Sequence, residues 1–113
     1  MALMSKSVIW NFTGDGDGGF PADSALTAVH GGYVASSSGG GNSPAGQYGA
    51  IVKFIPPMPG KSAWAEQTLH TFSNGGDGAV PVGVLLYADG VVYGTTYGYS
   101  GAAASGTVFK ITP

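Results

Sequence analysis

Short apolar runs separated by glycine-rich turns alternate along the chain, and this pattern predicts β-strands. The run at residues 7–12 reads Ser-Val-Ile-Trp-Asn-Phe, and a segment rich in glycine and aspartate follows it. Two later runs joined by a tight turn at residues 30–32 predict a hairpin. No window has a helical period long enough to predict a helix. The predicted strands are residues 7–12, 22–30, 33–37, 50–55, 66–72, 82–88, 91–96 and 107–112.

The second half of the chain repeats the first. At an offset of sixty residues Phe12 matches Phe72, and beyond a glycine-rich loop the offset falls to fifty-seven, where Lys53 matches Lys110. Self-similarity at such a spacing indicates a repeat architecture, in which each unit buries its core against a neighbour. Further pairs are Asp17/Asp77, Pro21/Pro81, Leu26/Leu86, Ala28/Ala88 and Tyr33/Tyr93 at sixty, and Gly49/Gly106 and Pro56/Pro113 at fifty-seven.

Composition supports an all-β protein in which glycine supplies the turns. The 113 residues include 21 glycines, and 43% of the chain is hydrophobic whereas 9% is charged. This balance favours a folded domain over a disordered segment. The four lysines are scattered, arginine is absent and the net charge is −2. Because nucleic-acid binding needs a basic surface, we expect no nucleic-acid partner.

Other classes of protein are also disfavoured by composition. Cysteine is absent, so the chain has neither a disulfide framework nor thiolate metal ligands. No apolar run approaches the roughly 18 residues of a membrane span, and we expect no membrane partner. Residues 1–7 are too short and too polar for a signal peptide, which makes the cytoplasm the default compartment.

The second half of the chain resembles the GloVer-type β-propeller repeat, a bacterial family. The similarity rests on Phe72, Asp77-Gly78, Pro81, Asp89-Gly90, Tyr93-Gly94-Thr95-Thr96 and the closing Gly-Thr-Val-Phe-Lys-Ile-Thr-Pro at 106–113. The first half is degenerate, with Val34-Ala35-Ser36 in place of Gly-Thr-Thr. The resemblance implies four-stranded antiparallel propeller blades. Members of this family are often exported, and the family has no defined biochemical activity to carry over.

By analogy with propellers, residues 1–113 are expected to form a single two-blade unit, with 13–72 as the first repeat and 73–113 as the second. The first blade has four predicted strands and the second has three. Because a propeller closes with about 4–8 blades, we expect homo-oligomerisation into a closed ring. The expected ring is a trimer with six blades, or alternatively a tetramer with eight. Strand 7–12 is expected to complete a neighbour's blade beside strand 107–112. These complementary ends favour a complete unit, and a fragment of a longer propeller is the alternative.

Aromatic side chains in or near loops are the candidate ligand-binding residues. They are Tyr48, Trp64, Tyr97 and Tyr99. Tyr and Trp rings stack on sugar faces while their polar tips form hydrogen bonds, and a ring would present each site in several copies. Lectin-like, multivalent carbohydrate binding is therefore one hypothesis. Packing of these aromatics at subunit contacts is the favoured alternative.

Asp15, Asp17 and Asp77 lie in Asp-Gly segments that are superficially similar to calcium loops. The full ligand spacing of such loops is missing, so a turn role is favoured over a metal site. His30 and His70 have no spaced metal-ligand partner. A hydrolase using the three aspartates is the weakest alternative, and no cofactor is implied. The sequence therefore predicts a non-catalytic binding or structural scaffold.

Overall fold

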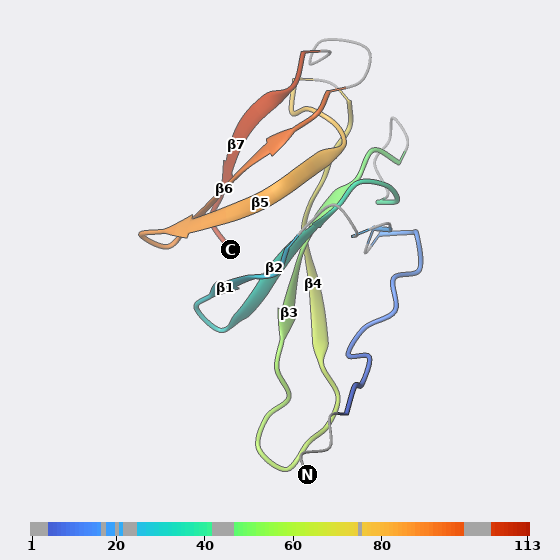
Figure 1. The fold of residues 1–113 in the computed structure, drawn as a ribbon, viewed down its shortest axis with the longest axis vertical. Helices are drawn as coiled ribbons and strands as arrows, with labels where there is room; N and C mark the ends of the chain where they lie inside the picture. The colour runs from blue at the N-terminus through green and yellow to red at the C-terminus, as the bar shows by residue number, and fades with distance from the viewer. Residues whose placement is uncertain are drawn as a thin grey trace.

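The computed structural model describes residues 5–16, 18–19, 21, 25–41, 47–74, 76–98 and 105–113. These residues form an all-β fold of two antiparallel sheets, with no α-helix among them (Figure 1). The first sheet has the order β1-β2-β3-β4 and the second has the order β5-β6-β7. The strands are β1 Thr27–Val29, β2 Gly32–Ser37, β3 Ala50–Ile55, β4 Ala65–Thr71, β5 Pro81–Ala88, β6 Val91–Thr96 and β7 Thr107–Ile111.

Most predicted strands are confirmed to within a residue or two at each end. The strands predicted at 50–55 and 91–96 have the observed bounds of β3 and β6. The strand predicted at 22–30 is wrong in length, because β1 covers only Thr27–Val29. Residues 7–12 do not form a strand within this chain. Their predicted partner is a neighbouring copy, so the missing strand leaves that prediction open.

The two sheets repeat the same hydrogen-bonding register, but with a different alignment from the one that matching letters suggest. Tyr33 lies opposite Phe54 in the first sheet, and Val92 lies opposite Ile111 in the second. Pairing alone fixes only the sum of the two offsets, and the glycine contacts select their values, because a Cβ at Gly49 would meet Ser37 O and one at Gly106 would meet Thr96 O. Equivalent positions are therefore 59 residues apart in β2 and β6 (96 − 37) and 57 apart in β3 and β7 (106 − 49). The pairing of Tyr33 with Tyr93 at sixty was wrong by one residue. A one-residue shift moves a side chain to the opposite face of its sheet.

This register defines two faces for each sheet, because directly opposite residues share a face. We call the side of Val34 and Ile51 the front face of the β1–β4 sheet, and the side of Ala35, Val52 and Phe54 its back face. In the β5–β7 sheet the equivalent front face carries Tyr93 and Val108, and the back face carries Val92, Gly94, Phe109 and Ile111.

The main core lies where the two sheets meet, and Phe72 fills the centre of this junction. Phe72 is 1% exposed and packs at an angle against Phe109, with ring centroids 5.4 Å apart. Thr27 also donates a side-chain hydrogen bond to the Leu85 carbonyl across the junction, at 2.8 Å. The core side chains are Val34 and Ile51 from one sheet, Leu85 and Val92 from the other, and Phe72 between them.

The sheets stack front to back. Val34 and Ile51 contribute the front face of the β1–β4 sheet, whereas Val92 contributes the back face of the β5–β7 sheet. In Figure 1 the orange and red sheet lies on one side of the β1–β4 sheet, and the blue amino-terminal segment lies on the other side. Two faces therefore remain outside the junction: the back of β1–β4 and the front of β5–β7.

Candidate functional site

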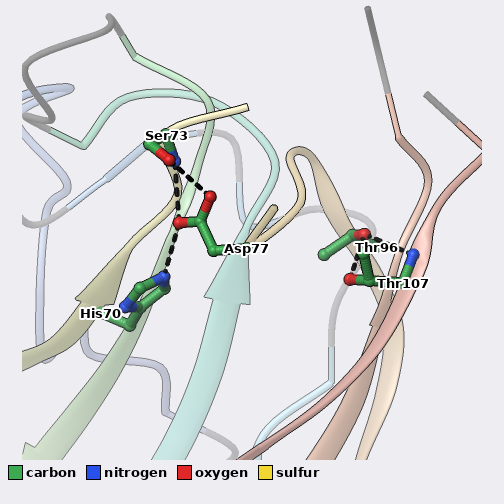
Figure 2. A network of polar contacts seen from close by, with 5 residues as sticks. All are labelled: His70, Ser73, Asp77, Thr96 and Thr107. Atoms are coloured by element: carbon green, nitrogen blue, oxygen red, sulfur yellow. Dashed lines mark hydrogen bonds and ion pairs between the residues drawn. The ribbon is translucent and has the colours of Figure 1, made fainter. Parts of the chain in front are cut away.

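Asp77 holds together the loop that follows β4. Its carboxylate accepts hydrogen bonds from the Ser73 backbone N–H at 3.0 Å and from the Ser73 hydroxyl, and it contacts the His70 Nε2 at 3.0 Å (Figure 2). His70 also packs edge-on against Phe72, with ring centroids 4.7 Å apart. Asp77 therefore fixes the turn that leads the chain from one sheet to the other.

This cluster does not have the order of a hydrolytic triad. In a triad the imidazole contacts the nucleophilic hydroxyl and the carboxylate supports the imidazole from behind. Here the Asp77 carboxylate lies between the Ser73 hydroxyl and the His70 ring. Such an arrangement orients a loop, and it places no imidazole against the hydroxyl.

Asp15 is the other candidate aspartate that the structure describes, and it lies in the first loop. Asp15 is exposed, and its backbone carbonyl accepts hydrogen bonds from Gly18 N at 2.9 Å and from Gly41 N. Asp17 lies outside the described residues. Within the part of the chain that the structure describes, no group of three or more His, Cys, Asp or Glu side chains could hold a metal ion.

The same glycine contact closes the loop end of each sheet. A Cβ atom at Gly78 would lie 2.7 Å from both the Thr96 and Thr107 hydroxyl oxygens, which are themselves 2.7 Å apart (Figure 2). A Cβ atom at Gly18 would meet the Ser37 hydroxyl and the Ala50 side chain. Ser37 and Ala50 are the positions equivalent to Thr96 and Thr107. The Asp-Gly loops thus pack on the strand ends through these glycines, and this contact gives the loops a structural role in both repeats.

The candidate ligand-binding aromatics lie at opposite ends of the sheets. Tyr48 and Tyr97 are joined through Val80, whose N–H donates to the Tyr48 carbonyl and whose carbonyl accepts from the Tyr97 N–H, both at 2.8 Å. The Tyr97 side chain is 73% exposed, whereas Tyr48 packs against the core. Trp64 lies at the other end beside Tyr33, with ring centroids 6.2 Å apart. Tyr99 lies outside the described residues.

The front face of the β5–β7 sheet is exposed and carries three large apolar side chains beside Thr95 and Lys110. Val108 is 80% exposed, although its equivalent Ile51 is fully buried in the junction. Tyr93 is 39% exposed, and its equivalent Val34 is fully buried. We call Leu86, Tyr93 and Val108 the open front face. An alignment at sixty pairs Tyr93 with Tyr33, which lies on the back face of its own sheet, and so does not reveal the equivalence of Tyr93 and Val34.

The back face of the β1–β4 sheet is only partly covered. Trp10 and Phe12 pack on Phe54, with ring centroids 6.0 and 5.8 Å away. Beside them lies an apolar groove that includes Pro21 and Leu26. Leu26 is 58% exposed, whereas Leu85, its equivalent at 59, is 3% exposed in the junction. We call this groove and its Leu26 rim the open back face.

No protein-family model matches the chain, and comparisons with curated proteins and with solved structures find no similar one. Among the described residues, no helix has the length and hydrophobicity needed to cross a bilayer.

Proposed function

We propose that the protein is a non-catalytic scaffold that assembles from identical chains into a closed β-propeller ring. One observation carries this proposal: the two sheets of the chain stack front to back. The open front face of β5–β7 is equivalent to the front face that β1–β4 buries. The open back face of β1–β4 is likewise equivalent to the back face that β5–β7 buries. A second copy can therefore repeat the junction between chains.

Contacts of this kind are heterologous, because each copy offers one face and receives the other. Such contacts form a ring when the rotation from copy to copy closes. Propellers close with roughly 4–8 blades, so a chain with two blades gives six from three copies or eight from four. We favour three copies. The exposed apolar faces also support association, since large apolar patches on soluble proteins mark interaction surfaces.

Native mass in solution tests this proposal. Light scattering after size-exclusion chromatography should give a single species at three times the chain mass, with four times as the alternative. Val108→Asp should convert it to a monomer that keeps its β-sheet circular dichroism, because a charge on the open front face would be desolvated at the contact.

Met58→Asp is the matched control. Met58 is 75% exposed and Val108 is 80% exposed, but Met58 lies in the loop between β3 and β4 and on neither open face. Both substitutions place a carboxylate at an exposed position of the single chain. In a ring, only the carboxylate at position 108 would be buried. A folded, monomeric parent chain, or equal effects of the two substitutions, would refute the assembly.

A second candidate function is binding of glycans at the loop end of the sheets. The observation that favours it is the exposed Tyr97, whose backbone is linked to that of Tyr48 by the two hydrogen bonds of Val80. A ring would repeat this position in every copy and add avidity. Glycan-array binding that Tyr97→Ala abolishes would support it, provided that the native mass stays unchanged. If no glycan on the array binds, the glycan-binding proposal is refuted and the scaffold proposal is unaffected.

A further inference from the structure

We propose that residues 6–11 of one copy form the fourth strand of the next copy's β5–β7 sheet, antiparallel to β7. The register places Ser7 opposite Lys110 and Asn11 opposite Thr107 of the other copy. This inference rests on the proposed ring and specifies how its copies are linked. It turns a three-stranded sheet into a counterpart of the β1–β4 sheet.

The register comes from the first sheet, where the fourth strand is present. Gln67 lies opposite Lys53, and Thr71 lies opposite Ala50, because a β-bulge opposite Ile51 and Val52 adds one residue to the fourth strand. The step from β3 to β7 is 57 residues, which carries Lys53 to Lys110 and Ala50 to Thr107.

The step from the amino-terminal segment to β4 is sixty residues, and backbone hydrogen bonds fix it. Gly14 N donates to Gly18 O in the first loop, and Asn74 N donates to Gly78 O in the second (74 − 14 and 78 − 18). At that offset Ser7 is equivalent to Gln67 in β4, and Asn11 is equivalent to Thr71. The offset of 57 for β7 and the offset of sixty for the amino-terminal segment together place Ser7 opposite Lys110 and Asn11 opposite Thr107.

The space for this strand is open beside β7. Within the described residues β7 pairs with β6 alone, and a groove runs along its other side, walled by His70, Gly76 and Asp77. In the first sheet β4 occupies the equivalent position, and its Thr68 hydroxyl donates to the Gly16 carbonyl at 2.9 Å. Gly76 is the equivalent of Gly16. The groove is therefore the unfilled counterpart of the space that β4 fills.

Phe12 already lies where a repeated junction needs it. Phe72 directly follows β4 and packs on the back face of the following sheet, with its ring 5.4 Å from Phe109. Phe12 packs on the back face of the β1–β4 sheet, with its ring 5.8 Å from Phe54. A strand over residues 6–11, directly before Phe12, thus lies at the open back face, where the β5–β7 sheet of that same next copy would dock.

Pairing would bury groups that a single chain leaves in water. Val8 is 62% exposed and Ile9 is 40% exposed, while the partly buried Leu69 at the position equivalent to Ile9 packs against the core. The outer backbone groups of β7 would gain partners, which removes an edge that could recruit other strands. Both gains require a second copy, since the amino-terminal segment packs on the opposite side of the β1–β4 sheet from β7.

Disulfide trapping tests the register, because the chain has no cysteine of its own. One preparation carries Ser7→Cys and a second, with a different affinity tag, carries Lys110→Cys. The two are mixed in the unfolded state, refolded together and mildly oxidised. Directly opposite positions satisfy disulfide geometry. We expect a dimer containing both tags to form on the order of a hundredfold faster than between unassociated chains, because juxtaposed thiols have millimolar effective concentrations. The matched control combines Asn11→Cys with the same Lys110→Cys, a pair three positions out of register.

Each outcome decides the matter. Cross-linking of Ser7→Cys with Lys110→Cys, and not of the control pair, supports the proposal. Equal cross-linking of both pairs overturns the register. A ring by native mass without the expected cross-link overturns strand exchange and leaves the ring intact, whereas a monomer without it overturns both.

Discussion

Phe72→Ala tests the stacking of the two sheets. The Phe72 ring is 1% exposed and contacts both Phe109 and His70. Truncating a buried phenylalanine costs about 3–5 kcal/mol, because transfer energy is lost and a cavity remains. The Phe72 backbone N–H still donates to Gly49 O, a bond of 3.0 Å in the parent chain, so the loss is one of packing. Against a total stability of about 5–15 kcal/mol, this is a large fraction.

Urea unfolding, followed by fluorescence of Trp10 and Trp64 and by circular dichroism, measures the loss. At a fixed chain concentration we expect a lower midpoint with an unchanged slope. The melting temperature should fall by roughly 12–20 °C, at about 4 °C per kcal/mol for a domain of this size. Met58→Ala, in an exposed loop, should stay within about 0.5 kcal/mol of the parent. A Phe72→Ala loss below about 1 kcal/mol would refute the packed junction.

Three further substitutions probe separate contacts. Phe12→Ala should weaken the assembly, so its rings should dissociate to monomers at a higher protein concentration than those of the parent when diluted; an unchanged dissociation concentration would contradict the exchange. Gly78→Ala should cost about 2–3 kcal/mol, because Gly78 has a φ of 93° and a Cβ there would collide with Thr96 and Thr107; unchanged chemical denaturation would contradict this contact. Asp77→Ala should cost about 1–3 kcal/mol through unpaired loop donors, and faster amide exchange at the loop following β4 should accompany it.

The strands were largely predictable from the sequence because their signals are local. At β3 and β6, short β-prone runs end at turn residues, and the predicted bounds agree with the structure. At β1 the apolar pattern extended through Ala25 and Leu26, but the strand covers only Thr27–Val29. The length of that strand depends on pairing, which sequence pattern does not encode.

The faces could not be predicted because of one ambiguous step in the repeat. Leu26 matches Leu86 by letter, but it matches the adjacent Leu85 equally well, and the hydrogen-bond register selects Leu85. The coincidence of Tyr33 with Tyr93 reinforced the wrong choice. Since side chains alternate with a period of two, an alignment at sixty assigns the side chains of β6 to the opposite faces of the β5–β7 sheet.

The candidate sites depended still more on tertiary structure. An aspartate at position 77 indicates a turn from sequence alone, but its contact with His70 needs the course of the loop. Trp64 and Tyr97 are both aromatic residues near loops, and nothing in their local sequence shows that they lie at opposite ends of the sheets.

The open front face of β5–β7 also determines how assembly depends on protein concentration. Each chain added to an incomplete ring covers one open front face and brings another, so every intermediate exposes as much apolar surface as the monomer. Only the contact that closes the ring leaves no open front face exposed. This contact joins two chains that are already tethered through the others, which makes it the most favourable step. Partial rings should therefore be scarce at equilibrium, and dilution should convert complete rings to monomers over a narrow concentration range. Cellular abundance, rather than any ligand, would then set the fraction of chains in the assembled state.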